Sequence, residues 1–110
     1  MSFELKIRGD YAILAGPARL NMVSAPKLRT AVAEALRAGH RRLVLDLVAT
    51  EFMDSTGLGA LVACLREARE TGGDFRIANA GTQVQMVFEL AGMDRLLRAY
   101  PSVDAAYGNP

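Results

Sequence analysis

The chain has 110 residues, 51% of them hydrophobic, with 13 basic and 12 acidic side chains and a net charge of +1. This length and apolar content predict one domain over residues 1–110, with a core spanning about residues 3–107. The balanced charge argues against nucleic acid or an anionic membrane as a partner. We expect a cytoplasmic protein, because the chain has a single cysteine, no signal-peptide pattern and no apolar run of roughly 20 residues.

The N-terminal residues predict a hairpin. Residues 3–8 alternate apolar and polar side chains, as in a half-buried strand. Gly9 and Asp10 are a turn pair, and residues 11–15 predict the returning strand.

A helix and a buried strand should follow. Ser24 is expected to cap a helix that accepts Pro26 in its first turn and stops at Gly39. Its apolar residues fall on one face, namely Leu28, Val32, Ala35 and Leu36. Residues 42–48 form an apolar run that predicts a central strand.

The spacing of the next segment predicts a second helix over about residues 56–71 and a strand over residues 74–78. The apolar side chains of this helix recur at helical spacing, at Leu58, Leu61, Val62 and Leu65.

The last part of the chain predicts a third helix over residues 83–90, a short strand over 96–100 and a helical turn over 103–106. The apolar stripe of that helix is Val84, Val87, Phe88 and Ala91, with Gly92 past its end. The resulting order is strand, strand, helix, strand, helix, strand, helix, strand, helix. It predicts an α/β domain with a mixed β-sheet of four to five strands and helical cover.

Catalytic sites are poorly supported. A serine hydrolase needs a base beside its nucleophile, but the only histidine, His40, is expected to be a solvated turn residue. The pattern G-x-S-x-G around Ser55 is broken by Met53. A phosphatase-type nucleophile at Asp46 would want a second acid two residues on, where Val48 stands, so we expect Asp46 to bond backbone donors.

Binding of nucleotides or metals is also poorly supported. The run from Thr56 to Gly59 brings two glycines to a helix start, but Ala60 occupies the place of the P-loop lysine. Gly57 and Gly59 are therefore interpreted as positions where the helix packs closely on the sheet. One cysteine and one histidine offer no zinc ligand set, so no metal and no cofactor are predicted.

Ser55 has two interpretations. Asp54, Ser55 and Thr56 are all good capping residues, and one cap suffices, so a hydroxyl is left over at a helix start that tolerates negative charge. This favours a phosphorylation switch, with a plain N-cap as the alternative. Met22 and Met53 are either core residues or exposed docking residues near Ser55.

The motif Phe52-Met53-Asp54-Ser55-Thr56-Gly57-Leu58-Gly59, after Leu45-Asp46-Leu47, resembles the signature of bacterial anti-sigma factor antagonists, which are stand-alone domains of the STAS group. The resemblance extends over nearly the whole chain, including the segments at residues 25–29 and 87–96. It implies a protein without catalytic activity of its own.

The resemblance also implies a mechanism. The unphosphorylated antagonist binds an anti-sigma factor that is also a serine kinase, and so frees a sigma factor. The kinase inactivates the antagonist by phosphorylating Ser55, with Thr56 as the less favoured site, and a PP2C-type phosphatase reverses the step. Such a chain acts as a monomer or weak dimer. The residues expected to contact the partner are Asn21, Met22, Met53, Asp54, Ser55, Thr56, Gly57, Leu58 and Gly59.

One departure from the family pattern concerns the loop before the first helix. Family members commonly carry Gly-x-Leu-Asp there, and this chain has Ala18-Arg19-Leu20-Asn21. Asn21 keeps a hydrogen-bonding cap but loses the charge, which bears on partner choice and not on fold.

The rival functions are a STAS scaffold in a sensor complex, a STAS subunit of a lipid or anion transport system, and a small nucleotide-binding enzyme.

Overall fold

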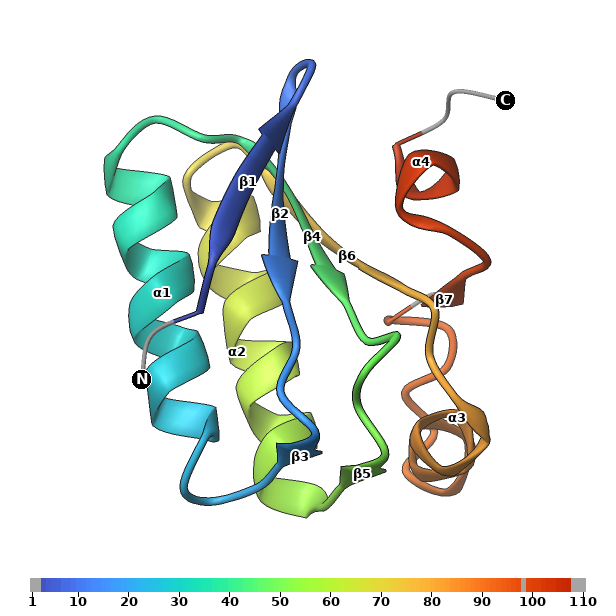
Figure 1. The fold of residues 1–110 in the computed structure, drawn as a ribbon. Helices are drawn as coiled ribbons and strands as arrows, with labels where there is room; N and C mark the ends of the chain where they lie inside the picture. Colours follow the sequence, from blue (N-terminus) through green and yellow to red (C-terminus); the bar gives the residue numbers. More distant parts are fainter. Residues whose placement is uncertain (1–2, 98, 108–110) are drawn as a thin grey trace.

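The computed structural model describes residues 3–97 and 99–107 and is built around a five-stranded sheet (Figure 1). The strand order is β1 (Leu5–Arg8), β2 (Tyr11–Ala15), β4 (Arg42–Asp46), β6 (Asp74–Ala78) and β7 (Ala99–Tyr100). β1 runs antiparallel to β2, and the other neighbours are parallel. The predicted α/β class and mixed sheet are confirmed.

Helices cover both sides of this sheet. α1 (Ala25–Arg37) and α2 (Ser55–Glu70) lie together on one face, and α4 (Val103–Ala106) packs on β4 and β6 from the other. α3 (Thr82–Leu90) sits near one end of the sheet, against α2 and the short strand β5 (Phe52–Met53). No helix in the described ranges is both long enough and apolar enough to span a membrane.

The side-chain alternation of the strands divides the core into two layers. Ala12, Leu14, Leu43 and Leu45 belong to the larger cluster, which includes most of the buried residues of α1 and α2. The smaller cluster joins the opposite face of the strands to α4. β4 is the central strand and its three apolar residues, Leu43, Val44 and Leu45, are fully buried, as predicted.

Some sequence-based expectations need correction. Residues 5–8 form a strand, but all four are exposed rather than half-buried, because β1 is paired on one side only, at the edge of the sheet. The strand predicted over 42–48 ends at Asp46. Of the strand predicted over 96–100, Ala99–Tyr100 is extended, and residue 98 lies outside the described residues. The N–H of Leu97 instead bonds the carbonyl of Met93 in a turn.

A second, two-stranded sheet was not predicted. β3 (Arg19–Leu20) pairs in parallel with β5, with Arg19 opposite Phe52 and Leu20 opposite Met53. Both strands are too short to produce a period in the sequence. They bring the loop before α1 beside the segment that enters α2.

Candidate functional site

The candidate site lies at the N-terminus of α2, whose first residue is Ser55. Asp54 has extended backbone, and its carboxylate accepts a hydrogen bond from the Gly57 N–H at 2.9 Å. Asp54 is therefore the N-cap of α2. Ser55 and Thr56 are exposed, and the cap does not need either of their hydroxyls.

The start of α2 is bonded to β3 and packs against it. The N–H of Asp54 donates to the carbonyl of Leu20 at 3.3 Å. Gly57 packs so closely on β3 that a Cβ there would overlap the Leu20 carbonyl oxygen. Close packing of Gly57 is confirmed, and because β3 fills the space beside this buried glycine, it has little surface for the partner contact expected of it.

Gly59 differs from Gly57. It lies in the second turn of α2, is exposed, and a Cβ there would meet nothing within 4 Å. The interpretation that Gly59 serves close packing on the sheet is therefore wrong. Its surface stays open beside Ser55, so its predicted place in the partner surface stays a prediction.

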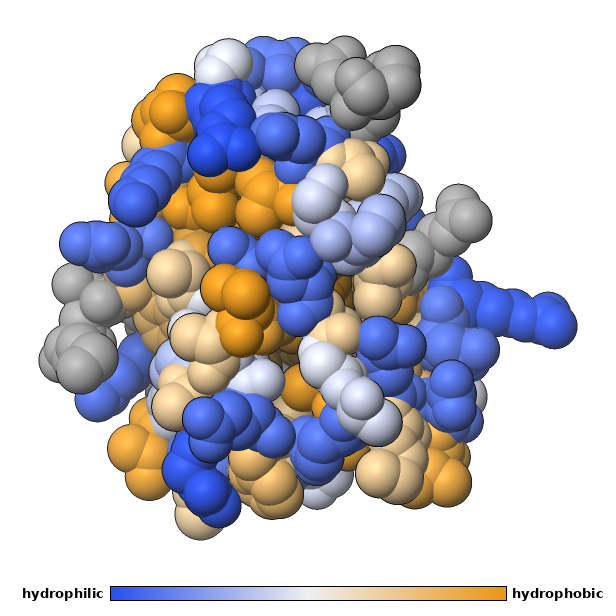
Figure 2. Space-filling model, turned by 45° about the vertical axis from the view of Figure 1, so that its right-hand side comes forward, coloured by the Kyte–Doolittle hydropathy of each residue, from blue (hydrophilic) through white to orange (hydrophobic). Residues whose placement is uncertain are grey.

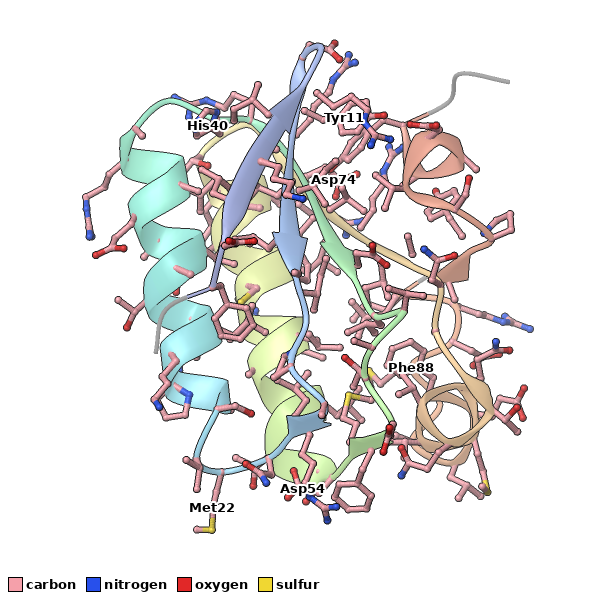
Figure 3. All side chains as sticks on the ribbon, viewed as in Figure 1. Tyr11, Met22, His40, Asp54, Asp74 and Phe88 are labelled. Carbon is pink, nitrogen blue, oxygen red and sulfur yellow. The ribbon has the colours of Figure 1, made fainter. Side chains whose placement is uncertain are left out.

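The loop between β3 and α1 forms the second part of the site. The side-chain oxygen of Asn21 accepts hydrogen bonds from the N–H groups of Val23 at 3.0 Å and Ser24 at 3.3 Å. This turn lifts Met22 and Val23 outward, and their side chains are 72% and 67% exposed. Figure 3 shows Met22 projecting from the same end of the molecule as Asp54.

Ser24 precedes α1 as predicted, but its side chain does not cap the helix. Its hydroxyl accepts from the N–H of Asn21 at 3.1 Å and donates to the carbonyl of Arg19 at 2.8 Å. The hydroxyl is occupied because it closes the loop onto β3. Asn21 and Ser24 together give this loop a fixed shape.

Two predicted contact residues lie in the core. Met53 is 1% exposed and Leu58 is 8% exposed. The docking interpretation of Met53 is wrong, because in β5 its side chain points inward while Phe52 and Asp54 are partly exposed. Leu58 belongs to the buried stripe of α2, so its side chain has almost no surface to offer.

Sequence reasoning missed Gln83 of α3. Its side-chain amide accepts from the N–H of Met53 at 2.8 Å and donates to the carbonyl of Met53 at 2.9 Å. Both backbone groups of the residue two positions before Ser55 are thus fixed by one side chain. A glutamine on a predicted helix gives no sequence signal for such a contact.

Charge at the site is of both signs. Asp54 supplies a carboxylate beside Ser55, while the free N–H groups at the start of α2 carry positive partial charge. The guanidinium of Arg19 lies 4.7 Å from the centre of the Phe52 ring, on the β3–β5 sheet. An anion on Ser55 would be tolerated by the helix terminus, but would add to the charge of Asp54.

Residues that could act as catalysts are placed elsewhere or are occupied. Figure 3 shows His40, half-buried after α1, at the opposite end of the molecule from Asp54. Asp46 accepts from the N–H of Val48 at 3.1 Å and from the side chain of Asn79 at 2.9 Å, in line with its predicted role. Burial raises the pKa of Cys64 from 9.0 to about 12, so it is a poor nucleophile.

The described residues also offer little for a ligand-dependent chemistry. Within residues 3–97 and 99–107, no three His, Cys, Asp or Glu side chains are grouped to hold a metal ion. Figure 2 shows several separate apolar patches with hydrophilic side chains between them on the side that carries α3 and α4. Around Ser55 the structure places an exposed surface that includes Ser55, Thr56 and Met22.

Comparisons with known proteins agree with this fold. Residues 2–106 match the STAS domain. A putative anti-sigma factor antagonist of Thermotoga maritima is 30% identical over 94% of this chain and 93% of its own length. Its crystal structure superposes with a TM-score of 0.84, covering 94% of this chain and 90% of that one. An anti-sigma factor antagonist from Mycobacterium paratuberculosis is 27% identical, with a TM-score of 0.83 and 96% and 89% of the two chains covered.

Proposed function

Because this chain belongs to the STAS domain family, and because relatives over most of its length are named anti-sigma factor antagonists, we propose that it is an anti-sigma factor antagonist. Its unphosphorylated form binds an anti-sigma factor with serine kinase activity and releases a sigma factor. Phosphorylation of Ser55 ends that binding, and a PP2C-type phosphatase restores it.

One observation carries the proposal. Ser55 is exposed at the first position of α2, and the neighbouring Asp54 makes the cap. A kinase can therefore reach the Ser55 hydroxyl without the helix losing its N-terminal hydrogen bond. Thr56 is also exposed and has the same chemistry, which makes it the natural control residue.

The partner surface would consist of the exposed and partly exposed residues around Ser55. Asn21 and Met22 come from the β3–α1 loop, while Thr56 and Gly59 come from α2. Met22 is flexible and apolar, which suits a docking residue. Asp54 adds a partly exposed carboxylate to the same surface.

Phosphorylation would act on the complex and leave the fold intact. A phosphoryl group adds about −1.5 to −2 charges and three acceptor oxygens. The start of α2 stabilises an anion, since its free N–H groups face it. In a closed interface the same charge, next to Asp54, would have to lose its water. Shifting occupancy from 99% to 1% requires about a 10⁴-fold loss of affinity, or about 5.5 kcal/mol, and an uncompensated buried charge has this order of cost.

The deciding experiment is mass spectrometry of the protein purified from its native cells, with and without stress. We expect an added mass of one phosphoryl group that maps to Ser55, persists in Thr56→Ala and disappears in Ser55→Ala. Binding to the organism's own serine-kinase anti-sigma factor should be lost in Ser55→Asp and kept in Thr56→Ala. A chain that stays unmodified under every condition, with Ser55→Asp binding as wild type, would support a scaffold or adaptor role instead.

A further inference from the structure

β1 has one open side. It pairs with β2 through Arg8 opposite Tyr11 and Lys6 opposite Ile13. The pair next to a two-residue turn is hydrogen-bonded and the pairs alternate, so Arg8 and Lys6 bond to β2. The N–H and C=O groups of Leu5 and Ile7 must therefore point away from β2, toward the open edge.

Apolar side chains accompany these free backbone groups. Leu5 is 40% exposed and Ile7 is 57% exposed, although both are large and apolar. The other two residues of the strand are exposed as well. An open edge with exposed apolar side chains is a template for another strand.

The sequence of this edge is complementary to itself. The proposed pair also uses Phe3 and Glu4, which directly precede β1, as a continuation of the strand. In an antiparallel pair centred on Leu5, Lys6 of each copy then stands opposite Glu4 of the other. Leu5 then faces Leu5 of the second copy, and Ile7 faces Phe3. Every cross-strand pair from residue 3 to residue 7 is either apolar with apolar or acidic with basic, which are the stabilising combinations.

The charges of the edge favour this register over its neighbours. A pair centred on Lys6 would place that lysine opposite itself, and a pair centred on Ile7 would place Lys6 opposite Arg8. Among the residues that the structure describes, neither Glu4 nor Lys6 forms an ion pair, whereas Arg8 pairs with Asp104 at 2.8 Å. The two side chains that the Leu5 register needs are thus unengaged.

We propose that β1 is a homodimer interface, in which a second copy of this chain adds its β1 antiparallel with Leu5 on the two-fold axis. The two five-stranded sheets then continue as one. None of the residues around Ser55 takes part, so the interface does not depend on the function proposed above and leaves that surface free.

Disulfide trapping tests the interface and its register together. In the proposed pair, the two Leu5 Cα atoms would be about 5.5 Å apart, within disulfide range, while the two Lys6 Cα atoms would be beyond the limit of about 7 Å. The native Cys64 is 1% exposed and does not interfere. We expect Leu5→Cys to cross-link about tenfold faster than Lys6→Cys under mild oxidation. Faster cross-linking of Lys6→Cys would overturn the register.

Charge reversal gives an independent test without cysteines. Light scattering of the wild type should show a mass rising from 11.8 kDa toward twice that value with concentration. Lys6→Glu places acid opposite acid at both symmetric pairs, and dimerisation should weaken about tenfold. The double variant with Glu4→Lys and Lys6→Glu restores opposite charges and should dimerise as wild type. A wild type that stays at 11.8 kDa up to millimolar concentration would overturn the proposal, and so would a double variant as weak as Lys6→Glu alone.

Discussion

The side chain of Gln83 fixes the backbone of Met53 on both sides, with hydrogen bonds of 2.8 and 2.9 Å to its N–H and C=O groups. This contact links α3 to β5, the short strand that leads into Ser55. Since Met53 is buried, water cannot easily replace the two bonds. Gln83 therefore holds the strand that leads into Ser55, although it lies 30 residues after Met53 along the chain.

Replacing Gln83 with alanine should leave both groups of Met53 without their partner. We expect the free energy of unfolding to fall by about 2 kcal/mol, the cost of unsatisfied buried polar groups. Urea denaturation measures this loss in the free energy of unfolding. The matched control is Glu89→Ala, since Glu89 is an exposed residue of the same helix. Equal loss in the two variants would mean that the two hydrogen bonds do not stabilise β5.

The two glycines of α2 should respond in opposite ways to alanine. A Cβ at Gly57 overlaps backbone of Leu20, which cannot move as a side chain can, so Gly57→Ala should destabilise the protein by about 1–3 kcal/mol. Gly59 is helical with open space around it, so Gly59→Ala should stabilise by about 0.5–1 kcal/mol.

Thermal unfolding of both glycine variants tests this. Stabilisation by Gly57→Ala would show that β3 does not pack as described. If Gly59→Ala folds well but loses affinity for the anti-sigma factor, Gly59 belongs to the partner surface, as the family resemblance implies.

Asp54 should matter for stability through its cap. Asp54→Ala removes the acceptor for the Gly57 N–H and should cost about 1 kcal/mol. Asp54→Asn keeps an acceptor, since asparagine is an equally good N-cap residue, and should be near wild type in urea denaturation. A similar loss in both variants would point to the charge of Asp54, rather than its hydrogen bond, as the stabilising feature.

The Cys64 thiol should be protected in the folded protein. Burial raises its pKa from 9.0 to about 12, with Glu67 adding to the effect, so at pH 8 a thiol reagent should label it slowly until the protein is unfolded in urea. Equal labelling rates with and without urea would contradict the burial of Cys64 between α2 and the sheet.

The same pKa shift makes stability depend on pH. The folded state holds the thiol proton more tightly than the unfolded chain, so this contribution is complete below pH 9 and is lost as pH rises toward 12. The urea midpoint of Cys64→Ala should therefore fall less between pH 9 and pH 11 than that of the wild type.

Tyr107 offers a second alkaline-sensitive contact. Its hydroxyl donates to the carbonyl of Leu43 at 2.6 Å and lies 3.0 Å from the carbonyl of Asp74. Burial, followed by the charge of Asp74, raises the pKa of Tyr107 above its ordinary value of 10.0. Folding stability from this group is thus present at neutral pH and is lost above pH 10.

Tyr107→Phe removes this hydroxyl but keeps the ring that lies beside Arg76 and Tyr11. At pH 7 it should cost about 1 kcal/mol, the typical net value of a hydrogen bond. Above pH 10 the difference from wild type should shrink, because the tyrosine ionises in the unfolded wild-type chain while the folded state holds its proton, and the phenylalanine variant has no such group. A constant difference across pH would show that the hydroxyl does not titrate with unfolding.

The periodicity of apolar residues determined the helices and the main strands from the sequence alone. Burial of one helical stripe and of alternate strand positions is a local pattern that survives in the chain itself. This is why α1, α2, α3 and the central strand β4 were predicted close to their observed bounds. Capping chemistry also predicted that a helix starts near residues 54–56, and the structure decided that Asp54 is the cap and Ser55 the first helical residue.

Tertiary structure alone decided which of these residues reach the surface. Met53 looked as available as Met22, yet β5 turns it into the core while the Asn21 turn lifts Met22 out. β3 and β5 have two residues each, which is too short for a pattern of alternating apolar residues. They form because the fold brings the two segments together as a parallel pair. The exposure of β1 likewise depends on its place at the edge of the sheet. The local sequence determines whether a segment forms a helix or a strand, because the apolar period lies within the segment. Which face of that element is buried depends on the elements packed against it, and these lie far away along the chain.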